Sequence, residues 1–521
     1  MATVRRSFRV SVGFKVAVAA LLVCLADLLF FSHELGSSVG VFALAWLVGT
    51  VATRPGMLRD GRAMAAIVAA LLMAGVMIDR PGLLSWALFA VALTVAAMSA
   101  RVARGEPAWR WGQRFIVQGV IGAFGPLIDL RRFMRARRMT RGPSLLGLMG
   151  IVALPLFGAV VFISLFAGAN PIIADILARF TLPPISLETM VRAVFWGLVL
   201  VTVGATLRPR WRGKLISLPT GGTRRIIGVN AASITLSLAV FNLLFAVQNG
   251  LDLAFLWSGA PLPEGVTLAE YAHRGAYPLV VTALLAGAFV LITLKPGSET
   301  ATRPLVRGLV MLWAAQNMLL VASSMLRTLD YIDAYALTRF RLVALIWMAL
   351  VGLGLLLICW RLLRDRSAHW LINANLSALL LVLAAVSVVD LGAITAAWNV
   401  RHAREIDGTG AQLDLCYLNQ IGSAAVVSLA ELEATTTDPA LKARVGSVRW
   451  GVQSDMRRRQ KAWRGWNWRD ARRLVEVEAR VGGTPALGRG DRDCYGYLIP
   501  VPLPPAPPPP VIIPLTSTAG G

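Results

Sequence analysis

The chain is poor in the residues that build metal and catalytic centres. Its 521 residues include only four histidines and four cysteines. Neither an HExxH nor a paired CxxC spacing occurs, so the sequence predicts no metal site. No serine, cysteine or metal constellation typical of an enzyme is present either. We therefore predict no catalytic residue and no cofactor, and keep a membrane-embedded enzyme only as the last alternative.

Charged residues are also scarce, at 15%, whereas apolar residues reach 56%, which excludes an ordinary soluble domain. A helix that crosses a bilayer needs about 20 largely apolar residues and must satisfy its own backbone hydrogen bonds. Uncharged stretches of this kind predict eleven spans, with ten to twelve left open. They are residues 16–31, 35–52, 63–78, 81–100, 145–167, 193–207, 226–247, 275–294, 308–326, 342–360 and 371–398. The predicted fold class is an all-α polytopic membrane helix bundle with a small helical extramembrane C-terminal domain.

The loops between these stretches alternate in basic charge. Loops on one side hold 29 Lys and Arg residues, and loops on the other side hold seven. Because basic residues near spans are retained in the cytoplasm, the N-terminus is predicted to be cytoplasmic. Eleven spans then place the C-terminal domain outside, in the periplasm if the protein lies in a bacterial inner membrane. An even number of spans would reverse that placement.

The net charge of +24 follows from this loop bias, so we predict no nucleic-acid partner. Residues 107–141 combine arginines with apolar residues at near-helical spacing. Such a segment is typical of an amphipathic helix on the inner leaflet, with its arginines near anionic lipid head groups. The predicted partners are therefore the lipid bilayer and anionic head groups.

Four regions follow from composition: a cytoplasmic tail (1–14), a transmembrane domain (15–399), an external helical domain (400–482) and a Pro-rich tail (483–521). Two cysteines, Cys416 and Cys494, fall beyond the last span. If the topology holds they lie in an oxidising compartment, where either a disulfide or two free thiols can exist. Tryptophans interleaved with arginines between 450 and 469 suit lipid head groups, an envelope partner or simply a small helical core.

Polar groups concentrate at the predicted outer ends of the spans, where ionisable residues are costly and therefore informative. The candidate polar site consists of Asp27, Asn170, Glu270, Tyr271, Arg274, Tyr335, Thr338, Arg341 and Asp390. The spacing of Tyr335, Thr338 and Arg341 predicts one stripe. In the functional interpretation, Arg274 or Arg341 binds an anionic group and a carboxylate takes protons. In the alternative interpretation, these residues anchor helix ends at the membrane interface.

Two stretches around these residues resemble a bacterial family of multi-pass membrane proteins catalogued only as a domain of unknown function. They are residues 269–280, with Glu270 and Tyr271, and residues 331–341. The similarity continues into 168–171, 398–400, 414–418 and 463–468. In the pattern Tyr-Gly-Leu-Thr-x-x-Arg, Ala336 replaces the glycine, a departure that concerns local backbone freedom. The resemblance implies a membrane helix bundle and supplies no activity.

These observations favour transport, or lipid or solute handling, through an outward-facing polar site. The alternative is an envelope sensing or assembly protein that uses its external C-terminal domain. No internal repeat or pair of broken spans marks a midplane transport site, so the sequence leaves the substrate open.

Overall fold

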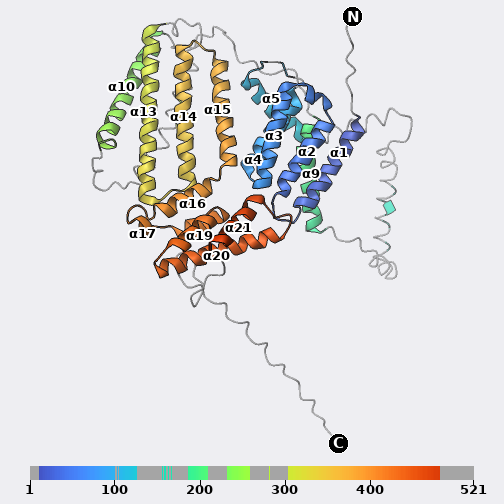
Figure 1. Ribbon diagram of the computed structural model, residues 1–521. Helices are drawn as coiled ribbons and strands as arrows, with labels where there is room; N and C mark the ends of the chain where they lie inside the picture. Colours follow the sequence, from blue (N-terminus) through green and yellow to red (C-terminus); the bar gives the residue numbers. More distant parts are fainter. Residues whose placement is uncertain are drawn as a thin grey trace. The chain divides into compact units, whose positions relative to one another are not determined.

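The computed structural model describes residues 11–99, 102–103, 105–125, 186–208, 231–258 and 303–481, with single positions at 155, 158, 159, 162, 166, 281, 285 and 494. Within these residues the regular structure is helical and contains no strand, which confirms the all-α class. Figure 1 shows the chain coloured along its sequence. The chain divides into two compact units. Each unit is described by itself.

The first unit comprises Met1–Asp333, Thr338–Leu391 and Arg458–Arg472 and holds the apolar helices. These are α1 (Val12–Phe30), α2 (Ser38–Ala52), α3 (Gly61–Asp79), α4 (Leu83–Ser99), α9 (Leu187–Leu207), α10 (Ala231–Phe255), α13 (Pro304–Tyr335), α14 (Arg339–Leu363) and α15 (Ala368–Val388). Seven of the helices that the structure describes are long and apolar enough to cross a membrane, while α2 and α4 are shorter apolar helices.

Nine of the eleven predicted spans coincide with these helices, and the predicted spans at 145–167 and 275–294 lie outside the described residues except for single positions. Three predicted ends require correction. The seventh span continues past Val247 to Phe255, and the ninth continues past Leu326 to Tyr335. The eleventh stops at Val388 and does not reach Trp398. Counting apolar length ends a span at the first polar or charged residues, although a helix can continue through polar residues and through a charge that is buried and paired.

Two apolar cores hold this unit together. One contains helices α1 to α4 and α9 around the fully buried Trp46, which packs against Phe42, Trp86 and Phe89. The Trp46 indole N–H is satisfied by Thr206 Oγ1 at 2.8 Å, as a buried indole requires. The other core joins α10, α13, α14 and α15. Contacts from α15 to α4 and to the amphipathic helix α5 (Ala108–Ala123) connect the two groups of helices.

The helix ends of the first unit sort into two groups. At the basic end, defined by Arg54, Arg62 and Arg307, arginines meet helix C-termini: Arg54 donates to Leu207 O at 3.2 Å and Ala97 O at 2.8 Å. At the acidic end, defined by Asp27, Asp79 and Asp390, carboxylates meet arginines. This grouping follows the alternation of spans that the sequence predicts.

The second unit comprises Ala334–Leu337, Gly392–Arg457 and Arg473–Gly521. Its helices are α16 (Leu391–Arg401), α17 (Arg404–Asp407), α18 (Leu415–Ile421), α19 (Val426–Thr435), most of α20 (Pro439–Lys461) and the end of α21 (Trp468–Val481). Two apolar clusters form its interior, one around Leu418 and Leu429 and one around Met456 and Val477. A buried Arg449 is held by Glu433 at 2.6 Å and by Gln453.

The division differs from the predicted boundary at residue 400. The second unit includes the turn Ala334–Leu337, which lies between two apolar helices in sequence, and the first unit includes Arg458–Arg472 of the C-terminal region. Hydrogen bonds between residues far apart in sequence hold both segments, and no local sequence pattern predicts such bonds.

Candidate functional site

Asp27, the first predicted polar residue, lies one turn before the end of α1 and has a fixed partner. Arg192 of α9 donates its Nε to Asp27 Oδ1 at 2.8 Å, and Trp196 Nε1 donates to the same oxygen at 2.9 Å. The Arg192 guanidinium also lies 5.1 Å from the centre of the Phe31 ring. This pair neutralises Asp27 at the acidic end, as an intramembrane carboxylate requires.

Asp390 does not lie inside a span, where the sequence placed it, but in the break between α15 and α16. The backbone leaves the helix at Val389, which adopts extended dihedral angles. Arg80 Nη1 lies 2.9 Å from Asp390 Oδ2. A carboxylate beyond the helix end avoids the cost of the hydrocarbon layer, which is why the predicted continuous span was wrong here.

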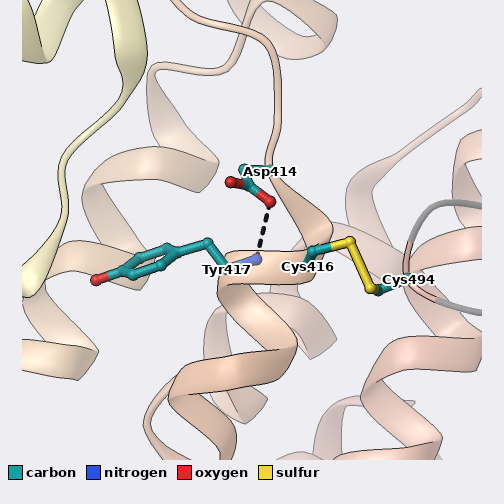
Figure 2. Close-up of a disulfide and its surroundings, with 4 residues drawn as sticks. All are labelled: Asp414, Cys416, Tyr417 and Cys494. Atoms are coloured by element: carbon teal, nitrogen blue, oxygen red, sulfur yellow. Dashed lines mark hydrogen bonds between the residues drawn. A yellow bond between two sulfur atoms is a disulfide. The ribbon is translucent and has the colours of Figure 1, made fainter.

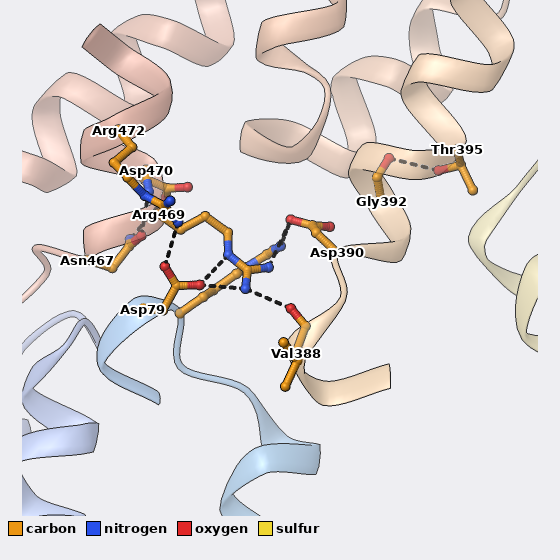
Figure 3. Close-up of polar contacts among 10 residues, drawn as sticks. Asp79, Val388, Asp390, Gly392, Thr395, Asn467, Arg469, Asp470 and Arg472 are labelled. Atoms are coloured by element: carbon orange, nitrogen blue, oxygen red, sulfur yellow. Dashed lines mark hydrogen bonds and ion pairs between the residues drawn. The ribbon is translucent and has the colours of Figure 1, made fainter. Parts of the chain in front are cut away.

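Asp390 belongs to a network that includes the C-terminal segment, shown in Figure 3. Arg469 donates its Nε to Asp79 Oδ2 at 2.6 Å and an Nη to Val388 O at 3.0 Å, and another Nη lies 3.4 Å from Asp390. Arg472 adds a 3.0 Å bond to the second oxygen of Asp79. One guanidinium thus joins the ends of α3 and α15, and shared charges of this kind couple energetically.

Tyr335, Thr338 and Arg341 do not form the predicted stripe, because the helix breaks between them. Helix α13 ends at Tyr335, Ala336 adopts a positive φ of 64°, and α14 begins at Arg339. Thr338 caps α14 by accepting a bond from the Arg341 backbone N–H at 3.3 Å. The Arg341 guanidinium lies 4.2 Å from the centre of the Tyr331 ring, a cation–π contact.

The turn after α13 is held by one side chain of the second unit. Asn399 Oδ1 accepts the Leu337 backbone N–H at 2.8 Å, and Asn399 Nδ2 donates to Leu337 O at 2.9 Å. Both polar backbone groups of Leu337 are thereby satisfied in a buried position, which isolated turns rarely achieve. Two stretches that carried the family resemblance, around Leu337 and Asn399, therefore meet in the fold.

The remaining candidates, Asn170, Glu270, Tyr271 and Arg274, lie outside the described residues. The described candidates form three separate sets of contacts, centred on Asp27, Asp390 and the turn at Ala336. None of the contacts described above joins one of these sets to another.

A different polar feature lies between α10 and α13, where the sequence placed no site. Asn242 donates to Leu309 O at 3.0 Å, and Asn249 donates to Gln316 O at 3.2 Å. The two contacts share a separation of 67 residues, so the helices run parallel, as predicted for spans seven and nine. We call the polar residues along this contact the α10–α13 seam: Asn242, Asn249, Asp252, Gln316, Ser323 and Arg327.

A buried ion pair ends the seam. Asp252 and Arg327 are 2% and 8% exposed, and an Arg327 Nη bonds Asp252 Oδ1. Gln248 donates to the same carboxylate oxygen at 3.1 Å. From Asn242 to Asp252 the seam rises about 15 Å at 1.5 Å per residue, and an apolar layer of about 30 Å would contain all of it. Burying both charges there costs free energy, and ionisable pairs that a membrane bundle retains at this cost usually have a function beyond packing.

Several seam oxygens are buried without a donor. Among the residues that the structure describes, no group donates a hydrogen bond to Asn242 Oδ1, Asn249 Oδ1, Asp252 Oδ2 or Gln316 Oε1. Buried acceptors are normally satisfied, and an unsatisfied cluster calls for water, an ion or a ligand. Among the described residues no group of three or more His, Cys, Asp or Glu could hold a metal ion, so amide oxygens and one ion pair define the chemistry of the seam.

The seam was not predicted from the sequence, because the seventh span was predicted to end at Val247 and Arg327 was predicted to lie in a loop. A signal was present: Asn242, Asn249 and Asp252 are spaced i, i+7 and i+10, which places them on one helix face. Extending the span until the apolar face ended would have found it. Its partners on α13 could not be found in this way, because the register between two helices is a tertiary property.

The two cysteines of the second unit are joined by a disulfide, with Cα atoms 4.8 Å apart and a sequence separation of 78. Cys416 lies in the first turn of α18, which Asp414 caps by accepting the Tyr417 N–H at 2.8 Å (Figure 2). Cys24 and Cys359 are free. The bridge links α18 to a point beyond α21, the last helix that the structure describes.

Residues 63–432, more than two thirds of the chain, match the family described as a domain of unknown function, DUF4153. The chain belongs to the DUF4153 family. No curated protein and no solved structure matches it. The DUF4153 match includes the seam, Ala336 and Asn399, and it ends before Arg469. Together with the apolar helices, it identifies a multi-pass membrane protein of the DUF4153 family.

Proposed function

We propose that this protein transports an anionic solute together with protons through the α10–α13 seam. The observation that carries the proposal is the buried Asp252–Arg327 pair beside amide oxygens that lack donors. A guanidinium recognises carboxylate and phosphate groups in a planar, two-pronged geometry. An intramembrane ionisable pair in a bundle is by default a functional hypothesis.

The proposed chemistry is an exchange of partners at Arg327. While Asp252 is charged, its carboxylate occupies the guanidinium. Protonation of Asp252 weakens that ion pair, so an entering anion can take its place, and loss of the proton on the far side restores the pair. Asn242 and Asn249 supply the polar surface along which water or solute passes.

We further propose a bacterial inner-membrane location with the basic end cytoplasmic. The loop bias of 29 to seven basic residues supports this orientation. The segment Arg458–Arg472 then lies on the external side, because Arg469 and Arg472 bind Asp79 at the acidic end. The seam pair then lies toward the external side, in line with the outward-facing site that the sequence suggested.

The test uses purified full-length protein in liposomes that contain a pH-sensitive dye, with a potassium gradient to drive proton entry. Inorganic phosphate, sulfate and succinate are added in turn as anionic probes. We expect one of them to raise the proton entry rate in the wild type, and Asp252→Asn and Arg327→Gln each to reduce that increase at least tenfold. Asp27→Asn is the matched control, since it alters a carboxylate–arginine pair outside the seam.

Equal rates in the wild type, both seam variants and the control would overturn the proposal, provided that thermal melts show all four proteins folded. A loss in Asp27→Asn equal to that in Asp252→Asn would also contradict it, because the effect would then not belong to the seam.

Envelope sensing is the second candidate. It is favoured by the C-terminal unit, which has its own apolar clusters and a disulfide. Removing residues 400–521 would not test it, since that change also deletes Arg469 from the membrane unit. The double change Cys416→Ser and Cys494→Ser is a more specific test. Sensing predicts an altered envelope stress response in cells while proton uptake stays unchanged. Transport alone predicts that both the stress response and proton uptake stay unchanged.

A further inference from the structure

The segment Arg458–Trp468 is bound to the acidic end of the membrane unit through its backbone. Trp466 O accepts the Ser37 N–H at 2.7 Å, and Arg464 O accepts Ser38 Oγ at 3.2 Å. Gly36 permits this approach, because a Cβ there would lie 2.4 Å from the carbonyl oxygens of both Arg464 and Trp466. The segment is thereby fixed at the level where α1 ends and α2 begins.

Two large aromatic side chains of this segment face outward. Trp463 and Trp468 are 60% and 53% exposed, although tryptophan is usually well buried in a folded chain. Trp466, between them, is partly covered and meets Trp468 edge to face at 6.0 Å. Tryptophans concentrate at the membrane–water interface, where an apolar ring with one N–H donor fits the head-group region.

Cationic side chains accompany the two rings. Arg464 donates its Nε to Leu28 O at 2.8 Å, and its guanidinium lies 4.5 Å from the centre of the Trp463 ring. Arg458 and Lys461 are exposed on the same segment. The segment therefore combines positive charge with aromatic side chains suited to the membrane interface.

We propose that Arg458–Trp468 is a lipid-binding anchor that holds the phosphate of an anionic phospholipid in the leaflet at the acidic end. Trp463 and Trp468 enter the head-group region, and Arg458, Lys461 and Arg464 face the lipid phosphates. The inference is independent of the seam, since it depends on other residues at the ends of other helices. The ends of α1 and α2 place the segment at the level of the membrane–water interface, and its positive charge favours anionic over zwitterionic lipids.

The test reconstitutes full-length protein in vesicles containing phospholipids brominated near the carbonyl groups, which quench nearby tryptophan fluorescence. Trp463 and Trp468 are two of 16 tryptophans. We expect the double change Trp463→Phe and Trp468→Phe to remove clearly more than one eighth of the quenchable fluorescence, which is their share by number. Trp450→Phe is the matched control, because Trp450 also pairs with an arginine, Arg457 at 5.3 Å, but belongs to the other unit.

The second arm compares brominated phosphatidylglycerol with brominated phosphatidylcholine at equal mole fraction. Each near-surface cation gives roughly a fivefold preference for the anionic lipid, and we expect Arg458→Gln with Lys461→Gln, which leaves Arg464 in place, to lower the preference at least about fivefold. Loss of an eighth or less in the tryptophan variant, or quenching of the same two rings by aqueous iodide, would show a water-facing segment and overturn the proposal. An unchanged lipid preference in the Gln variant would overturn the head-group assignment.

Discussion

The two ends of the membrane unit use arginine in different ways. At the basic end, Arg54 and Arg62 donate mainly to backbone carbonyls: Arg54 to Ala97 and Leu207, and Arg62 to Ser99, Val102 and Ala103 at 2.9–3.0 Å, with Asp60 at 3.4 Å as a further partner of Arg62. At the acidic end, Arg192 and Arg469 pair mainly with carboxylates. A bond to a carbonyl leaves the positive charge of an arginine almost intact, whereas a carboxylate cancels it.

This difference bears on the orientation that we propose. Helix C-termini present only partial negative charge, so the arginines that cap them keep most of their own charge, and such charges favour retention in the cytoplasm. At the other end, aspartates pair with arginines that would otherwise be uncompensated charges at the ends of the apolar helices. Counting basic residues predicts the side, and the tertiary structure shows which of them are paired.

The largest expected effect is all-or-none and concerns the sidedness of the two ends. With Cys24 and Cys359 replaced by Ala, we introduce His33→Cys, between α1 and α2, or Arg59→Cys, between α2 and α3; both positions are exposed. A membrane-impermeant thiol reagent applied to intact spheroplasts should label His33→Cys and leave Arg59→Cys unlabelled until lysis. Labelling in the opposite order would reverse the proposed orientation, and equal labelling before lysis would remove the distinction between the ends.

The next effect breaks the charge cancellation at the acidic end. Asp79→Asn with Asp390→Asn should destabilise the protein by about 3 kcal/mol, because a partly buried Arg469 loses both carboxylates. Thermal melts in detergent measure the loss, and hydrogen exchange should show it first in residues 458–472. Asp365→Asn, an exposed partner of Arg307 at 3.5 Å, is the control that should change little. A loss no larger than that of the control would contradict the network.

A smaller effect separates charge from geometry at the basic end. Arg54→Lys keeps the charge but cannot make both bonds to Leu207 and Ala97 in the fork geometry of a guanidinium. Orientation should remain, while stability falls by about 1–2 kcal/mol for the lost charged hydrogen bond. Thiol labelling of His33→Cys in this background checks the first outcome and thermal melts check the second. A reversed orientation would show that geometry, and not charge alone, sets the topology.

The smallest effect changes no charge and tests the backbone alone. Ala336 has a φ of 64°, which costs a residue with a Cβ about 1 kcal/mol relative to glycine. Ala336→Gly should therefore stabilise the protein slightly, and Ala336→Val should destabilise it by more. Equal melting temperatures for all three would mean that the strain at this turn is absent.

Much of the fold could be predicted from apolar length, because a hydrocarbon layer forces each span to be a helix that satisfies its own backbone. The nine described apolar helices were found in this way. The ends of the helices were harder to predict. Helix α10 continues past Asp252, whose charge Arg327 neutralises. Helix α15, in contrast, ends before Asp390, whose partners include an arginine about 80 residues further along the chain.

The candidate site shows the same limit. The sequence predicted that the charge of Asp27 needs a partner, but it could not identify Arg192 and Trp196, which come from a helix 165 or more residues away. Tyr335, Thr338 and Arg341 were read as a stripe because sequence spacing assumes a continuous helix, and Ala336 breaks it.

The sequence by itself determined the class of this protein, the location of the nine apolar helices that the structure describes and the asymmetry of charge between its loops, since these depend only on the cost of placing each residue type in lipid or water. The tertiary structure alone decided which charges meet. The pairing of Asp252 with Arg327, the anchoring of Trp466 at Ser37 and the hold of Asn399 on Leu337 each depend on the register of elements far apart in the chain. That register is set by packing, which composition and periodicity do not encode.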